Sequence, residues 1–292
     1  MNKISRRHFL TAGSMAVAAT SLGGFAEEDN SKIGQTPHTK FAINVEMWWT
    51  DLDFLERIRK TAELGFPAIE FWDLQGKDLD AIRKTCDELN LEIIQFTAWG
   101  FNPGMNDPAN HDMVEEKIKF ACEAGKKLNC KMATVVGGDD QPGMTREEMH
   151  QNIITALKRV APIAEENDLM LILEPMNIRV DHKGHCLYGS DPAIAICKAV
   201  NSSHVKINWD LYHLQITEGD LCGHMREGME YIGYLQLADT PGRNEPGTGE
   251  INYARVLKEA HDLGYRGYVG VECRPSGDPV AAAKRLAMAD QW

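Results

Sequence analysis

The strongest constraint on the fold is a regular alternation of short apolar runs with longer stretches of helical periodicity. Apolar residues recur at three- and four-residue intervals from Leu52 to Leu64 and from Met149 to Ile163, as on the buried face of a helix. The runs expected to form strands cover residues 41–47, 68–72, 92–99, 131–136, 169–174, 205–210, 233–238 and 268–272. Several predicted helices end at a glycine or an asparagine, which is typical of helix C-termini. This alternation predicts a parallel sheet covered by helices.

The number of repeats predicts a closed α/β barrel. Eight predicted strands are each followed by a predicted helix, the last at Asp278–Trp292, and a (β/α)8 TIM barrel has this organisation in roughly 250 residues. An open doubly wound sheet shows the same alternation, but no glycine-rich phosphate-binding fingerprint follows the first predicted strand. We therefore expect residues 41–292 to form a single-domain TIM barrel.

The first 26 residues have the features of an export signal. The arginines Arg6 and Arg7 precede an apolar run, residues 10–22, that is too short to span a membrane as a mature helix. The arginine pair resembles a twin-arginine signal. We expect residues 1–26 to be a twin-arginine-type signal peptide and residues 27–40 to be a linker. The mature protein would then be periplasmic and not bound to a membrane.

Charge and cysteine content exclude two classes of protein. The chain has 43 acidic and 31 basic residues and a net charge of −12, whereas surfaces that bind nucleic acid are basic. Its seven cysteines are odd in number and contain no CxxC pair, so we expect no disulfide framework. These numbers are compatible with a small-molecule substrate, and they leave open whether the protein forms a homo-oligomer.

Carboxylates close several of the predicted strands. In a TIM barrel the functional side chains lie at the C-terminal ends of the strands, and a carboxylate buried there without a counter-charge is costly. The polar residues at or just beyond these ends are Glu46, Glu70, Glu174, Asp210, Gln236, Asp239 and Glu272. Glu174, Asp210 and Glu272 end three of the last four strands, and Gln236 adds an amide oxygen from the remaining one. Such an oxygen-rich site suits Mg²⁺ or Mn²⁺.

The loop after the seventh predicted strand has the features of an active-site rim. It runs from Asp239 to Glu250 and combines turn-forming glycines and prolines with Arg243. A histidine, His213, lies just beyond the end of the preceding strand, three residues after Asp210. A plain surface loop would show the same turn residues, so these features alone do not decide its role.

Four segments contain most of these residues: LILEPMN at 171–177, NWDLYHLQ at 208–215, LQLADTPGRNEPGTGEINY at 235–253 and GVECRP at 270–275. In this order and spacing they resemble the hydroxypyruvate isomerase family of xylose-isomerase-like TIM barrels. The opening segment at 44–72 resembles the first βαβ unit of that family as well. The similarity extends from Phe41 to the C-terminus, and its most specific part is PGRNEPGTGEINY.

The resemblance implies a role for each of these residues. The implied ligands of a divalent metal, Mg²⁺ or Mn²⁺, are Glu174, Asp210, Gln236 and Glu272. Glu174 and Glu272 would also be the catalytic acid–base pair. His213 and Arg243 would bind substrate oxygens, with Glu250 nearby. Related sugar epimerases have a histidine where this chain has Gln236, which favours the isomerase branch.

These roles imply isomerisation of a small α-hydroxy carbonyl compound through an enediolate, with hydroxypyruvate and tartronate semialdehyde as the family's pair. The alternatives are a ketose 3-epimerase or other sugar isomerase, a metal-dependent lyase or dehydratase on the same barrel, and a non-catalytic periplasmic carbohydrate-binding barrel. Exchange of solvent protons into the substrate would distinguish the isomerase and the epimerase from the non-catalytic binding barrel.

Two features depart from the family pattern. The loop after Asn177 contains His182 and His185, which we expect to be solvent-exposed, with extra metal ligands as the alternative. Tryptophans end the first three predicted strands, at Trp48, Trp49, Trp72 and Trp99. Such residues usually pack in a core, but Trp48 and Trp99 could also form an apolar wall against which a sugar stacks. That wall would suit a substrate larger than hydroxypyruvate.

Overall fold

The computed structural model describes residues 29–292. The predicted signal peptide, residues 1–26, lies outside the described residues and stays a prediction. Within the described range, no helix has both the length and the apolar character needed to cross a membrane.

Within residues 29–292, nine parallel strands form one sheet in the order β3-β2-β1-β9-β8-β7-β6-β5-β4. The strands are β1 (Lys40–Asn44), β2 (Ala68–Glu70), β3 (Glu92–Ile93), β4 (Phe96–Trp99), β5 (Met132–Val136), β6 (Met170–Glu174), β7 (Val205–Asp210), β8 (Ile232–Leu237) and β9 (Tyr268–Val271). Each lies within or close to one of the eight predicted runs, and only the third run is split in two.

The split strand is where the barrel closes. β3 pairs with β2, and β4 pairs with β5, so one bent segment of chain connects the two ends of the sheet. Backbone hydrogen bonds continue across the interruption, from Ile94 N to Ile69 O at 3.0 Å and from Thr97 N to Trp72 O at 3.1 Å. The segment bends because its first half, β3, pairs with β2 and its second half, β4, pairs with β5. The predicted (β/α)8 TIM barrel is thereby confirmed.

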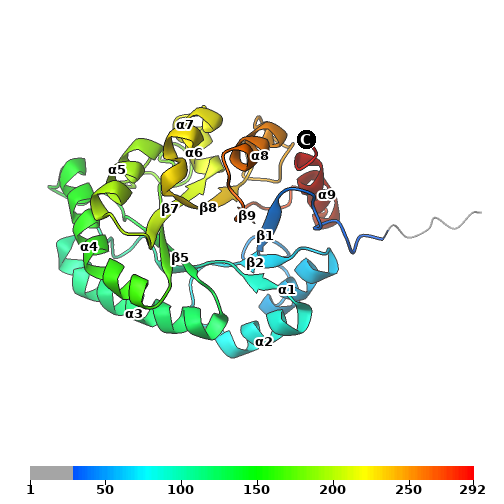
Figure 1. Cartoon of the computed structure of the whole chain (residues 1–292), viewed down its shortest axis with the longest axis horizontal. Coiled ribbons are helices and arrows are strands. Elements are labelled where there is room, and N and C mark those ends of the chain that lie inside the picture. Colours follow the sequence, from blue (N-terminus) through cyan, green and yellow to red (C-terminus); the bar gives the residue numbers. More distant parts are fainter. Residues whose placement is uncertain (1–28) are drawn as a thin grey trace, which may run out of the picture.

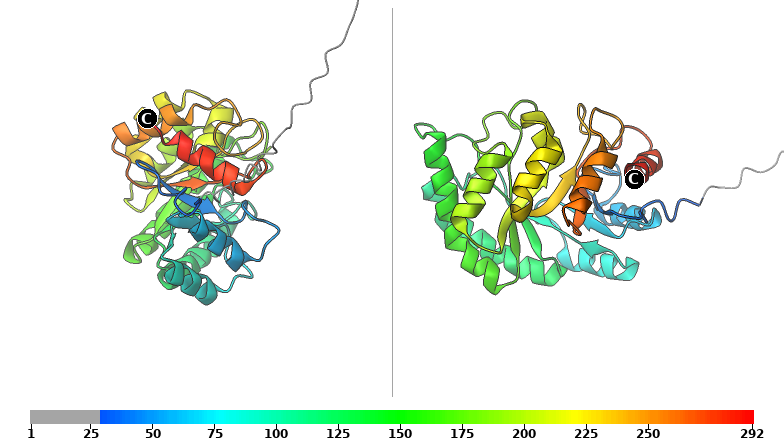
Figure 2. Two further views of the ribbon diagram at one scale, coloured as in Figure 1. Left: turned by 90° about the vertical axis from the view of Figure 1, so that its right-hand side faces the viewer. Right: turned by 45° about the horizontal axis from the view of Figure 1, so that its top comes forward.

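Helices surround the strands, as Figure 1 shows and as the two further views in Figure 2 repeat. They are α1 (Phe54–Glu63), α2 (Leu79–Leu89), α3 (His111–Leu128), α4 (Arg146–Glu166), α5 (Ser190–Val200), α6 (Leu211–Thr217), α7 (Leu221–Gly228), α8 (Tyr253–Asp262) and α9 (Pro279–Ala289), with short 3-10 turns at Pro108–Asn110 and Met229–Tyr231. Two of the predicted helix ends, Asn90 and Asn129, are C-caps in the left-handed region, at φ of 55° and 51°.

Apolar side chains fill the lower part of the barrel interior. The inward residues there form a small cluster of their own: Ala42, Ala68, Ile94, Ile172 and Tyr234. The larger core lies outside the strands, where each helix buries one stripe, such as Ile153, Leu157 and Val160 of α4. Since the lower barrel is filled, polar side chains at the C-terminal strand ends lie on a packed floor.

Candidate active site

Three of the predicted acids meet at one point above the barrel. Glu174 ends β6, Asp210 ends β7 and Glu272 follows β9, so neighbouring strands bring them together. Side-chain atoms of these acids and of His213 lie within 4.8 Å of one another, and all four residues are buried. Gln236 lies on β8 as the register partner of Asp210 and lines the same pocket. The structure thus gathers the predicted metal ligands at one site.

The acid cluster carries more negative than positive charge. Burial, together with the charges of Glu272 and Asp210, raises the pKa of Glu174 well above its usual value. Burial also raises the pKa of Asp210, although Arg243 opposes this. Arg243 Nη2 lies 2.6 Å from Glu272 Oε2 and 3.9 Å from Asp210 Oδ2. When Glu174, Asp210 and Glu272 are all ionised, the single positive charge of Arg243 leaves two negative charges of the cluster uncompensated.

One oxygen of the cluster has no hydrogen-bond partner. Asp210 Oδ1 accepts the backbone N–H groups of Tyr212 and His213, at 2.7 and 3.2 Å. Its other oxygen, Oδ2, is buried without a partner. An orphaned carboxylate oxygen among uncompensated acids has the chemistry that a hard divalent cation requires. The residues present therefore fit Mg²⁺ or Mn²⁺.

The proton of His213 is fixed on the ring nitrogen that faces the acids. Its Nδ1 lies 3.3 Å from the backbone N of Asn177 and 2.7 Å from the Asn177 side-chain nitrogen. The Asn177 oxygen accepts the N–H groups of Val180 and Asp181, which sets the orientation of the amide. Nδ1 is therefore an acceptor, and in the neutral ring the proton lies on Nε2.

This tautomer makes His213 a hydrogen-bond donor. Its Nε2 lies 3.7 Å from both Glu174 Oε1 and Asp210 Oδ2. Arg243 Nη2 lies 3.5 Å from His213 Nε2. This contact is too long to reverse the tautomer that the two donors to Nδ1 set. Burial lowers the pKa of His213 well below its usual value, so the ring is neutral. A neutral Nε2–H can donate to a substrate oxygen but cannot ligate a metal through the same atom.

A buried acid lies beneath the cluster. Four side chains donate hydrogen bonds to the Glu70 carboxylate at 2.7–3.3 Å: Asn44, Gln95, Tyr234 and Gln236. The Gln236 oxygen in turn accepts from Asn208 at 2.6 Å, so both ends of its amide are held. Burial, and then the charge of Glu272, raise the pKa of Glu70 to about 7. Glu70 was among the strand-end acids, but sequence alone did not assign it to the site.

Trp72 makes a contact with Glu272 that the sequence analysis did not predict. Its indole Nε1 donates to Glu272 Oε1 at 2.7 Å, while Arg243 binds the other oxygen. Trp72 follows Glu70 by two residues, and the period of two along a strand places both on the inner face. This two-residue spacing is the sequence signal that could have placed Trp72 at the site.

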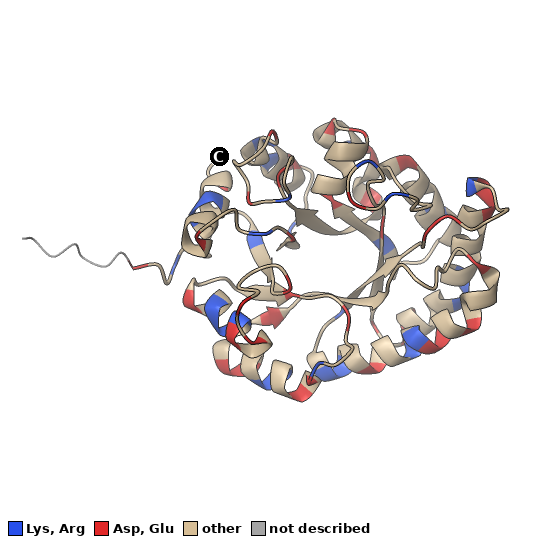
Figure 3. Cartoon of the chain, turned by 180° about the vertical axis from the view of Figure 1, so that it is seen from behind, with Lys and Arg blue, Asp and Glu red and all other residues tan. Residues whose placement is uncertain are grey.

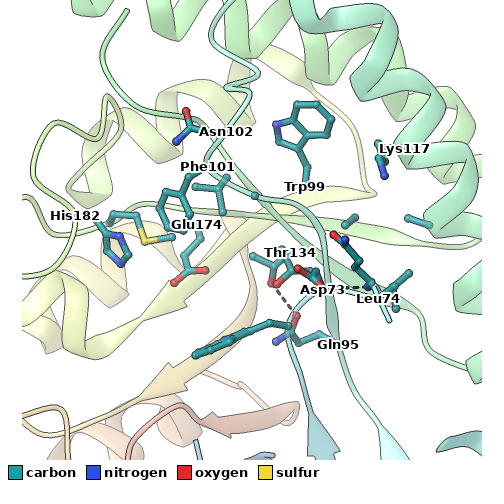
Figure 4. A pocket seen from close by; sticks show the side chains of 18 of the residues that line it. Asp73, Leu74, Gln95, Trp99, Phe101, Asn102, Lys117, Thr134, Glu174 and His182 are labelled. Atoms are coloured by element: carbon teal, nitrogen blue, oxygen red, sulfur yellow. Dashed lines mark hydrogen bonds between the residues drawn. The ribbon is translucent and has the colours of Figure 1, made fainter. Parts of the chain in front are cut away.

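The pocket above the cluster has a volume of about 680 Å³. Figure 4 shows Glu174 and His182 on one side of it and Lys117 and Leu74 on the other. The predicted substrate-binding residues His213, Arg243 and Trp99 line this pocket.

Two predicted substrate-binding residues lie elsewhere. Trp48 is fully buried, and its ring packs against Trp49 and Phe66. Glu250 is exposed on the outer loop, where it accepts a hydrogen bond from Gln215 at 3.2 Å. Neither lines the pocket, so their contact with substrate stays a prediction.

The two loop histidines are less exposed than we expected. His182 lines the pocket, and its ring stacks on Phe101 with centroids 4.7 Å apart. His185 is 1% exposed and lies 3.7 Å from Asp139. The loop folds over the barrel mouth through backbone hydrogen bonds such as Cys186 N to Gly138 O at 3.1 Å. The prediction of solvent exposure was wrong for His185, whereas His182 is half-buried. Neither ring belongs to the acid cluster.

Burial of His185 predicts a loss of stability in acid. Burial lowers its pKa to about 4, so between pH 4 and 6.5 the unfolded chain binds a proton that the folded protein does not. The stabilisation is complete above pH 6.5 and is lost as the pH falls. From pH 7 to pH 5 the wild type should lose about 2 kcal/mol more unfolding free energy than His185→Gln. Urea titrations at both pH values measure this, with His204→Gln as a surface control; equal losses in all three proteins would contradict it.

Comparison with known proteins gives concordant results. The chain matches the xylose isomerase-like TIM barrel family over residues 58–290. It is 32% identical to hydroxypyruvate isomerase of Escherichia coli (strain K12), covering 81% of this chain and 93% of that protein. It is 30% identical to 2-oxo-tetronate isomerase of Cupriavidus necator, with the same two coverages of 81% and 93%. A crystal structure described as AP endonuclease, family 2, from Brucella melitensis superposes with a TM-score of 0.81 at 26% identity, covering 86% of this chain and 98% of that one.

Proposed function

The chain belongs to the xylose isomerase-like TIM barrel family, and we propose that it is a metal-dependent isomerase of an α-hydroxy carbonyl compound. The two relatives from Escherichia coli and Cupriavidus necator named above are isomerases, and the chain is an enzyme of this class. The observation that carries the proposal is the acid cluster, in which the buried carboxylates of Glu174, Asp210 and Glu272 meet at one end of the pocket. We further propose that it acts in the periplasm, as the predicted signal peptide implies.

Glu174, Asp210, Gln236 and Glu272 would hold the metal. When bound, Mg²⁺ or Mn²⁺ supplies positive charge that stabilises the two oxygens of a substrate enediolate. The Gln236 amide is held by Glu70 and Asn208, so this ligand is positioned by side chains deeper in the barrel.

The remaining chemistry is proton transfer by the chain's own side chains. One of the two glutamates removes the proton from the carbon next to the substrate carbonyl, and one returns it to the neighbouring carbon. Trp72 and Arg243 hold the two oxygens of Glu272 and orient its carboxylate. The Nε2–H of His213 is available to donate to a substrate oxygen.

A nucleic-acid substrate fits this chain poorly. Figure 3 shows the Lys and Arg residues of the outer helices interspersed with Asp and Glu. The pocket itself contains buried carboxylates, which would repel a phosphate backbone. A small hydroxy-carbonyl compound needs no basic surface, because it binds inside the pocket.

Deuterium exchange in D₂O tests the proposal. The protein loaded with Mn²⁺ is incubated with hydroxypyruvate, tartronate semialdehyde and ketoses of four to six carbons. We expect deuterium to appear next to the carbonyl of at least one compound, and EDTA to slow that exchange by about a hundredfold or more, because the metal contributes several kcal/mol to stabilising the enediolate. Tight sugar binding without exchange would instead indicate the non-catalytic binding barrel.

A further inference from the structure

The pocket is larger than a three-carbon substrate requires. Its volume of about 680 Å³ lies within the range of roughly 300–1,000 Å³ in which proteins enclose drug-sized ligands. The acid cluster occupies one end of it. The other end extends past Trp72 and Trp99 to the side of α3, where Figure 4 shows Lys117 and Leu74.

We call this second end the apolar arm. It is lined by Trp72, Leu74, Trp99, Met113, Lys117 and Phe120. Its residues come from the β2–α2 loop, from β4 and from α3, so three separate segments build one surface. The arm is continuous with the acid cluster, because Trp72 lines it and also donates to Glu272.

Exposed apolar residues are concentrated in the arm. Among residues 29–292, five large apolar side chains are exposed, and three of them, Trp72, Met113 and Phe120, line this pocket at 38%, 48% and 56% exposure. Exposed apolar surface that is gathered in one place and joined to a polar site marks a binding surface. The other two, Val180 and Met288, do not line the pocket.

Resting on the proposed function, we infer that the substrate is an extended sugar, in which a ketose at the acid cluster carries a second ring that occupies the apolar arm. The C–H faces of sugar rings stack on aromatic side chains, which Trp72, Trp99 and Phe120 provide. The hydroxyl groups of that ring would remain within reach of the exposed Lys117 at the open end. A three-carbon acid would leave these side chains without a contact.

The test compares two ketoses that share the same keto end, only one of which carries a second ring. D-Fructose and isomaltulose share the same keto end, and isomaltulose carries a glucosyl ring on the carbon farthest from it. Deuterium exchange next to the carbonyl is measured for both with the Mn²⁺-loaded protein. We expect isomaltulose to exchange at least about tenfold faster at equal low concentration. The double variant Met113→Ser/Phe120→Ser should lower that ratio about tenfold, whereas Met288→Ser on α9 should not.

Each other outcome has a distinct meaning. Equal exchange of both sugars, or exchange of fructose or hydroxypyruvate alone, would overturn the inference and leave the proposed isomerase intact. If no compound exchanges, the proposed function fails, and isomaltulose binding is then measured by tryptophan fluorescence. Binding that the double variant weakens supports the apolar arm as a sugar site. Absence of binding overturns the inference. A change from dimer to monomer in the double variant, seen by light scattering, would assign the arm to a second copy of the chain and overturn the inference.

Discussion

Glu272→Gln is expected to lower turnover by about 10²–10⁴-fold, the range that loss of a positioned acid or base produces. The carboxylate is 5% exposed, and both of its oxygens are bonded, to Trp72 and to Arg243. An amide keeps the shape of the group but can neither take up a proton nor carry the charge that a metal ligand needs. The effect should appear in kcat measured at saturating metal.

The matched control is Glu92→Gln. Glu92 begins β3 at the opposite end of the barrel and accepts a hydrogen bond from Tyr268. Its replacement removes the same charge far from the cluster, so kcat should stay within about twofold of the wild type. If Glu272→Gln folds normally and retains wild-type turnover, the proposed proton transfer through Glu272 is wrong.

The architecture was predictable because it depends on repeated local signals. Each strand–helix unit has its own periodicity and its own stop residue, such as Asn90 or Asn129, so errors at one boundary do not propagate. The split of the third strand was not predictable, because it depends on which neighbours each half pairs with. That is a property of the closed sheet.

The site was predictable only where function requires a costly residue. Buried carboxylates at strand ends, such as Glu174 and Asp210, are conspicuous because nothing in packing favours them. Trp48 and Trp72 look alike in the sequence, yet one packs in the core and the other binds Glu272. His185 likewise became buried through long-range contacts of its loop, which no local pattern indicates.

Asp239→Ala is expected to have the second large effect, on both stability and activity. Asp239 is fully buried, and its carboxylate accepts four backbone N–H groups at 2.8–3.0 Å, from Thr240, Gly247, Gly249 and Ile251. It therefore organises the whole loop that carries Arg243. Truncation leaves four backbone donors to find other partners, each costing about 1–3 kcal/mol while buried. Partial rehydration of the loop limits the expected loss of unfolding free energy to about 3 kcal/mol.

The loss of activity should exceed what this destabilisation explains. Arg243 has a φ of 55°, a conformation that non-glycine residues adopt only when the surrounding loop holds them. Once the loop relaxes, the guanidinium no longer reaches Glu272, and a displacement of about 1 Å in a catalytic group costs roughly a hundredfold in kcat/KM. Asp239→Asn, which keeps one acceptor oxygen, should lie between the wild type and Asp239→Ala in both measurements.

Asp220→Ala is the control for Asp239→Ala. It shows the effect of losing one hydrogen bond to a carboxylate that does not organise the Arg243 loop. Asp220 is the N-cap of α7 and accepts a single backbone N–H, from Gly223. Its truncation should cost about 1 kcal/mol of unfolding free energy and leave kcat/KM unchanged. Urea denaturation and kcat/KM are measured for all three variants. Equal losses of stability for Asp239→Ala and Asp220→Ala, or an unchanged kcat/KM for Asp239→Ala, would show that Arg243 is positioned by something other than this carboxylate.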